Sequence, residues 1–82
     1  MGLREEILDK MIKRAAELFK KNPAELSAAT SFENDLKAKS VNYAQITTLL
    51  EAEFDVEIPF MDFKRKKTFG EAADYVRQLI EG

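Results

Sequence analysis

The chain has 82 residues, of which 13 are basic and 15 acidic, with a net charge of −2 and neither cysteine nor histidine. This length predicts one small domain over residues 1–82, with a thin core and little room for an enclosed active site. Without cysteine there are no disulfides or thiolate metal sites, and without histidine the commonest general base is missing. Composition therefore argues against an enzyme and against a metal centre.

No stretch approaches the roughly 18 apolar residues of a membrane-spanning helix. The N-terminal residues Met1-Gly2-Leu3-Arg4-Glu5-Glu6 also lack the apolar core of a secretory signal. We therefore expect a cytoplasmic protein with no stable membrane insertion.

The first predicted helix covers residues 3–20. Apolar side chains recur there at helical spacing from Leu3 to Phe19, with charged residues between them. Asn22-Pro23 ends the pattern, because a residue that precedes proline is pushed out of the helical region. The apolar stripe is expected to be core.

Residues 23–39 lose this periodicity and carry isolated apolar residues at Leu26, Phe32 and Leu36. We expect a long, ordered connection that these three side chains pin to the core. Connections of this length without regular structure are uncommon in compact domains and are often functional.

A second helical pattern begins directly after Ser40 and runs from Val41 to about Glu53. A serine at that position is a natural N-cap, because its side-chain oxygen can accept a hydrogen bond from a first-turn amide. Loss of such a cap in Ser40→Ala would cost on the order of 1 kcal/mol. The same position leaves the hydroxyl near the surface, within reach of another protein.

This second helix is apolar on two sides, which predicts a central helix packed by several neighbours or one that faces a cavity. One side is a stripe of small residues and the other is a bulky stripe: Val41, Ala44, Thr48 and Ala52 against Tyr43, Ile46 and Leu50.

Residues 54–59 alternate apolar and charged side chains but have no partner strand, so we predict an extended loop. If the ring of Phe54 is core, Phe54→Ala would cost about 3–5 kcal/mol. Residues 60–63 predict one short helix, and residues 64–67 form a basic run. Thr68 and Glu71 then form a capping box that starts a last helix ending near Gly82.

Three segments, taken together, resemble the acyl carrier protein family. Ser31-Phe32-x-x-Asp35-Leu36-x-Ala38-x-Ser40 is similar to the loop that leads into the family's modified serine. Glu51-Ala52-Glu53-Phe54-Asp55-Val56-Glu57-Ile58-Pro59 resembles the end of its second helix, and Thr68-x-Gly70-x-Ala72-x-Asp74-Tyr75 resembles the start of its fourth. They occur in the family's order and at matching separations.

The resemblance implies an all-α fold, a four-helix bundle with a long loop between helices I and II and a short helix III. It implies that Ser40 receives a 4′-phosphopantetheine arm from coenzyme A, whose thiol holds acyl intermediates for fatty-acid, lipid or polyketide biosynthesis. The implied partners are a phosphopantetheinyl transferase and acyl-loading and acyl-processing enzymes, and the protein is expected to be a monomer. The small-residue stripe could form a groove for the acyl chain or could be tight helix packing.

The sequence departs from the family's pattern around the serine. The family's Asp-Ser-Leu is Lys39-Ser40-Val41 here, and its usual glycine upstream is Lys37. Lysines beside the serine would repel the basic surface of a usual partner enzyme. We therefore expect dedicated partners of different charge.

The outward face of the second helix is typically acidic in the family. Here that face carries Asn42, Gln45 and Thr47, with acids only at Glu51 and Glu53. We predict that partners contact Lys39, Val41, Asn42, Gln45 and Glu51.

Other interpretations remain open at this point. The main one is an unmodified, carrier-like interaction module in which Ser40 is only a helix N-cap. Another is nucleic-acid binding through residues 64–67 with Phe60, Phe63 and Phe69 nearby, although the acidic charge balance and the core spacing of the phenylalanines argue against it. A catalytic Ser40–Lys39 pair is disfavoured because adjacent residues at a helix start point away from each other.

Overall fold

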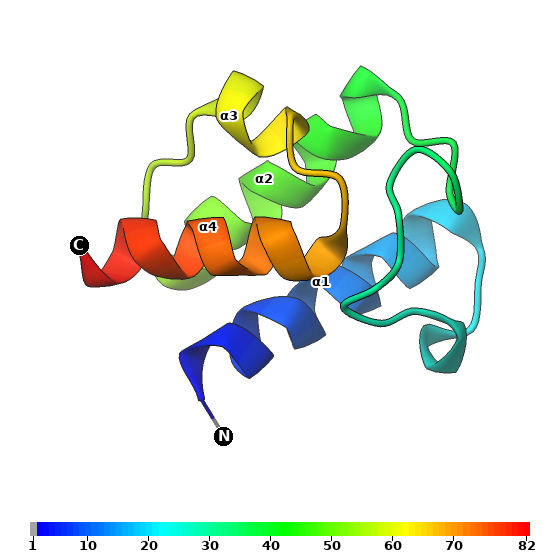
Figure 1. Ribbon diagram of the computed structural model, residues 1–82, viewed down its shortest axis with the longest axis horizontal. Coiled ribbons are helices and arrows are strands. Elements are labelled where there is room, and N and C mark those ends of the chain that lie inside the picture. The colour runs from blue at the N-terminus through cyan, green and yellow to red at the C-terminus, as the bar shows by residue number, and fades with distance from the viewer. Residues whose placement is uncertain (1) are drawn as a thin grey trace.

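The computed structural model describes residues 2–82 and is built from helices. Four α-helices are joined by loops and by a short 3₁₀ turn: α1 (Leu3–Phe19), η1 (Pro23–Glu25), α2 (Ser40–Phe54), α3 (Phe60–Lys64) and α4 (Phe69–Glu81). Helix α1 packs against both α2 and α4, and α3 packs against α2 (Figure 1). The predicted all-α four-helix bundle, with its long first connection and short third helix, is confirmed.

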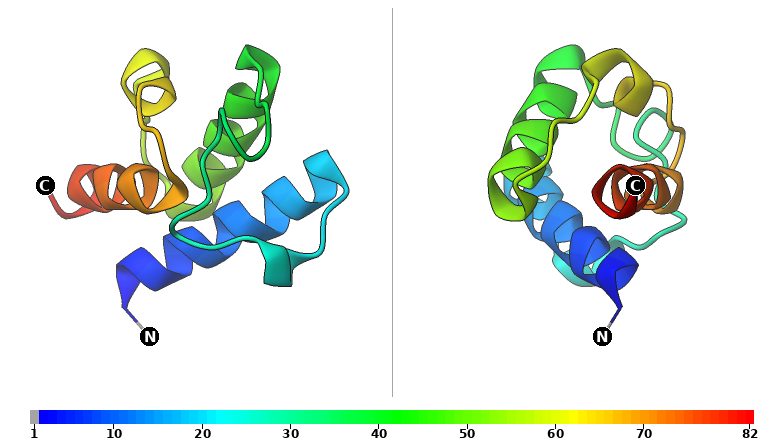
Figure 2. Two further views of the ribbon diagram at one scale, coloured as in Figure 1. Left: turned by 45° about the vertical axis from the view of Figure 1, so that its right-hand side comes forward. Right: turned by 90° about the vertical axis from the view of Figure 1, so that its left-hand side faces the viewer.

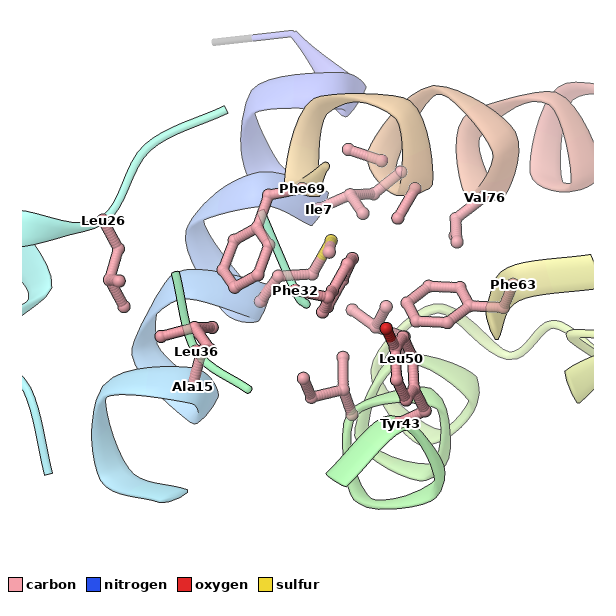
Figure 3. Packing of buried hydrophobic residues seen from close by; sticks show 14 of the residues in the cluster. Ile7, Ala15, Leu26, Phe32, Leu36, Tyr43, Leu50, Phe63, Phe69 and Val76 are labelled. Carbon is pink, nitrogen blue, oxygen red and sulfur yellow. The ribbon is translucent and has the colours of Figure 1, made fainter. Parts of the chain in front are cut away.

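The core is one continuous cluster of apolar side chains with Phe32 at its centre (Figure 3). The ring of Phe32 lies 4.9 Å from that of Tyr43, 4.7 Å from that of Phe69 and 6.0 Å from that of Phe63, measured between centroids. Tilted and edge-on aromatic pairs at such distances contribute beyond the apolar area that they bury. A residue of the long connection thus joins α2, α3 and α4.

The connection between α1 and α2 is ordered, as predicted, and Leu26, Phe32 and Leu36 are all buried. The sequence did not reveal how its backbone is held. Ser31 and Thr68 form an isolated antiparallel bridge, in which the Phe32 N–H donates to Lys67 O at 3.1 Å. Figure 2 shows this connection passing beside the segment that enters α4. The connection is therefore fixed on both sides, by buried side chains and by backbone hydrogen bonds.

Helix α2 is packed by several neighbours, as predicted, since α1, α3 and the connection all contact it, but it packs through one side rather than two. Tyr43, Ile46 and Leu50 are buried, whereas Val41 is 60% exposed and Thr48 and Ala52 are also exposed. The bulky stripe faces α1 and α3 (Figure 3), and the small-residue stripe lies largely on the surface, so it is not a tight helix contact. Thr48 of this stripe lines an open cleft beside α1 with Lys13 and Leu49.

The end of α2 is fixed by Glu51, whose Oε2 accepts a hydrogen bond from the Ile58 N–H at 2.9 Å. Asp55 adopts a left-handed conformation with φ of 50° and turns the chain out of the helix. Residues 55–59 then form the extended loop that the sequence predicted. Phe54 is only half-buried, so the condition for the full core cost of Phe54→Ala is not met.

Helix α4 begins as predicted, with the Thr68 hydroxyl accepting from the Glu71 N–H at 3.2 Å. Its second residue, Gly70, lies against the connection, where its N–H donates to Ala28 O at 2.8 Å. A Cβ at this position would lie 3.1 Å from the same carbonyl oxygen, so any larger residue would have to push the connection back by a few tenths of an ångström. Within the described residues, none of the helices has the length and hydrophobicity to cross a bilayer.

Candidate functional site

Ser40 is the first residue of α2, and its side chain is exposed. The residue before it, Lys39, has extended backbone angles, and its carbonyl accepts from the Asn42 N–H at 2.8 Å and the Tyr43 N–H at 3.2 Å. These bonds make Lys39 the N-cap residue. The prediction that Ser40 caps the helix is therefore wrong.

The cap is supplied from inside the helix by Asn42. Its Oδ1 accepts a hydrogen bond from the Lys39 N–H at 2.9 Å, which is the returning half of a capping box with asparagine in place of glutamate or glutamine. The sequence does place a polar residue that can accept this bond, Asn42, three positions after Lys39, but serine is the more common N-cap residue. The Ser40 hydroxyl is consequently not used to hold the helix together.

The Ser40 oxygen instead accepts a hydrogen bond from a lysine 24 residues away. Lys64 Nζ lies 2.8 Å from Ser40 Oγ. Lys64 is the last residue of α3, and the packing of α3 on α2 brings the two side chains together. Sequence reasoning missed this contact, because it depends on where a five-residue helix docks.

The basic run beside the site is only partly solvated. Arg65 and Lys67 are exposed, while Lys64 and Lys66 are half-buried, and Lys66 Nζ lies 4.7 Å from the centre of the Tyr75 ring. All four residues line an open cleft of about 200 Å³ that also includes Glu33 and Tyr43. The cleft is predominantly basic.

Tyr43 forms one wall of this cleft from the first turn of α2. Burial of the phenol, and then the nearby charge of Glu33, raise the pKa of Tyr43 above its ordinary value. The phenol is therefore neutral at physiological pH.

The residues predicted to meet partners are spread along α2. Lys39 and Val41 are exposed next to Ser40, and Asn42 and Gln45 are half-buried, with Asn42 Nδ2 lying 3.4 Å from Gln45 Oε1. Glu51 is eleven residues beyond Ser40, about 16 Å along the axis at the usual helical rise, and its carboxylate already binds the Ile58 N–H.

One side chain predicted to lie on the surface is buried, and two phenylalanines are buried as their core spacing predicted. Thr47 does not lie on the outward face, because it is 5% exposed and its hydroxyl donates to Ala44 O at 3.0 Å. Phe63 and Phe69 are fully buried, so they cannot stack on nucleic-acid bases. The basic run therefore lacks most of the aromatic surface that the nucleic-acid interpretation invoked.

Comparison with known proteins places this site in a family. Residues 9–76 match the family described as "Phosphopantetheine attachment site". The acyl carrier protein of Lactobacillus johnsonii is 33% identical over 73 residues, which cover 89% of this chain and 91% of that protein. The acyl carrier protein of Lactobacillus acidophilus is 34% identical over 73 residues, with the same coverage of 89% and 91%. The chain belongs to the acyl carrier protein family.

The prosthetic group of the acyl carrier family is 4′-phosphopantetheine, held covalently. The start of α2 suits such a group, because the Ser40 hydroxyl is exposed and a lysine ammonium already contacts it. The positive end of a helix also favours a phosphate. A substituent on this oxygen would break no hydrogen bond that caps the helix.

Proposed function

We propose that this carrier holds acyl intermediates as thioesters on a 4′-phosphopantetheine arm attached to Ser40, for fatty-acid biosynthesis or a related lipid or polyketide pathway. The observation that supports this proposal is that the Ser40 hydroxyl, at the start of α2, is exposed and does not cap the helix. When bound, the arm supplies a terminal thiol that forms the thioester.

Ser40 is favoured over the other serines of the chain by its hydrogen bonding. The sequence contains three serines, and the hydroxyls of the other two accept hydrogen bonds from backbone amides of the connection. Ser27 Oγ accepts from the Ala29 N–H at 3.2 Å, and Ser31 Oγ accepts from the Asn34 N–H at 3.0 Å. Modification of either oxygen would disturb a turn, whereas Ser40 carries only the side-chain contact from Lys64.

The protein's own contribution to loading is to present this hydroxyl on a fixed helix end. Phe32 and the Ser31–Thr68 bridge hold the preceding connection, and Asn42 closes the first turn. We propose that the chain adds no catalytic group of its own, since it has neither histidine nor cysteine and its Tyr43 phenol is neutral. The transferase would supply the base and the metal.

We propose a monomeric, single-domain carrier in the cytoplasm that meets a phosphopantetheinyl transferase and acyl-loading and acyl-processing enzymes. Its contact surface would comprise the predicted residues Lys39, Val41, Asn42, Gln45 and Glu51. The exposed cations Lys37 and Lys39 favour partners whose facing surface is neutral or acidic, because like charges slow association and oppose docking.

The test of the proposed function is the intact mass of the protein after incubation with coenzyme A, magnesium and a broad-specificity phosphopantetheinyl transferase. Wild type and the matched control Ser31→Ala are expected to gain one phosphopantetheine, and Ser40→Ala none. Loading of Ser40→Ala would contradict the assignment of the site. If wild type stays unmodified both here and when purified from its own cells, the unmodified interaction module is the better description.

A further inference from the structure

We propose that Lys64 binds the phosphate of the prosthetic arm, so that its ammonium group pairs with the phosphodiester that would join the arm to Ser40. This inference rests on the proposed function. Helix α3, whose last residue is Lys64, would then contact the attached group directly.

The position of Lys64 carries the inference. Its Nζ donates to Ser40 Oγ at 2.8 Å in the unmodified chain. On attachment, that oxygen becomes the ester oxygen of a phosphodiester, and the charged non-bridging oxygens lie on the phosphorus bonded to it. A side-chain rotation of Lys64 then suffices to replace a neutral acceptor with an anionic one. Hydrogen bonds between charged groups are shorter and roughly twice as strong as neutral ones.

The ammonium of Lys64 is not held by a carboxylate within ion-pair distance in the described part of the chain. Among residues 2–82, the ion pairs within 4.0 Å include Arg65 with Asp62, but none includes Lys64. The ammonium of Lys66, two residues later, lies over the face of the Tyr75 ring, 4.7 Å from its centre. A phosphodiester on Ser40 would therefore give Lys64 an anionic partner without breaking an existing pair.

The effect of Lys64 can be distinguished experimentally from the effect of the other cations around the site. Lys39 is adjacent to Ser40 in sequence, and Lys67 lines the same cleft as Lys64, but neither has a hydrogen bond to Ser40 Oγ in the described structure. Lys39→Gln and Lys67→Gln remove the same charge as Lys64→Gln. Lys64→Arg keeps the charge and tests whether a cation at this position is what matters.

The experiment compares the thermal midpoint of unfolding of each variant before and after loading, with complete loading confirmed by mass. In low salt, wild type and Lys64→Arg are expected to gain about 1–8 °C on loading, the range for an exposed ion pair in a domain of this size. Lys64→Gln is expected to lose most of this gain, while Lys39→Gln and Lys67→Gln keep it. In 1 M NaCl the wild-type gain is expected to fall, because the Debye length is then only about 3 Å.

The phosphorus resonance of the loaded proteins gives a second readout that does not depend on stability. We expect the ³¹P chemical shift to differ from wild type in Lys64→Gln and to stay near wild type in Lys39→Gln and Lys67→Gln. Equal gains and equal shifts in all three glutamine variants would overturn the role of Lys64 while leaving Ser40 as the attachment site. Failure of wild type to load at Ser40 would instead overturn the proposed function and this inference with it.

Discussion

The exposed hydroxyl of Ser40 accepts its hydrogen bond from Lys64, and the amide that precedes it in the chain is capped by Asn42. The side chain proposed to carry the arm, Ser40, is therefore not the one that caps the helix, which is Asn42 two residues later. A carrier benefits from this division, because the reactive oxygen can be substituted without loosening the helix that presents it.

At this scale we expect Ser40→Ala to change the free energy of unfolding by less than about 0.5 kcal/mol, as for an ordinary surface substitution. Asn42→Ala, which removes a cap, is expected to cost about 1 kcal/mol. Urea unfolding of both variants beside wild type provides the measurement. A larger loss in Ser40→Ala than in Asn42→Ala would show that the serine does cap the helix.

The elements of the fold are held together by the connection between α1 and α2, although most of it has no regular structure. Phe32 contacts three other aromatic rings from α2, α3 and the start of α4. In contrast, Phe54 lies at the edge of the core and is half-buried.

We therefore expect Phe32→Ala to destabilise the protein by about 3–5 kcal/mol, the range for a buried phenylalanine. Phe54→Ala is expected to cost roughly half as much, since less apolar area returns to water. The two variants can be compared by thermal and chemical unfolding. Similar costs for both would mean that the connection is peripheral to the core.

Most features that depend on residues close together in the sequence could be predicted, and those that depend on contacts between distant segments could not. The helices follow from the spacing of apolar residues, and the burial of Phe32 follows from its being an isolated apolar side chain in a polar connection, both of which are local information. Two predictions were wrong where a polar side chain bonds to nearby backbone. Asn42 accepts from the Lys39 N–H and supplies the cap, and the buried Thr47 hydroxyl donates to Ala44 O. The Ser40–Lys64 contact and the Ser31–Thr68 bridge depend on tertiary docking, which no local pattern encodes.

The whole molecule measures 31 × 28 × 19 Å along its principal axes, and one core serves its four helices. The start of α2 and helix α3 both lie at the top of the view in Figure 1, and the first turns of α1 lie at the bottom. Lys39, which precedes Ser40 in the chain, and Lys64, which contacts Ser40 from the basic run, therefore lie at the end of the molecule that holds Ser40.

Because the chain has no histidine, its stability is expected to change little near neutral pH and to fall in strong alkali. The pKa of Tyr43 is raised on folding by burial and by Glu33, so the folded state holds the phenolic proton more tightly than the unfolded state. The resulting stabilisation is fully present below the unfolded pKa of about 10 and is lost as the pH rises through the folded pKa.

Tyr43→Phe is thus expected to lose less stability between pH 8 and pH 11 than wild type does. Urea unfolding at the two pH values measures this difference, and lysine deprotonation contributes equally to both proteins. The same loss in both would rule out Tyr43 as a source of the alkaline sensitivity.

The bridge between Ser31 and Thr68 also has a consequence for how the molecule opens. The amide hydrogens of Phe32, Phe69 and Gly70 are bonded between the connection and the entry to α4, to Lys67 O, Thr30 O and Ala28 O. Their exchange with solvent requires those two segments to part, so we expect the three amides to exchange together as one opening unit. In the proposed carrier the connection and the entry to α4 would then move as one body, and the distance that the acyl group travels would be set by the arm.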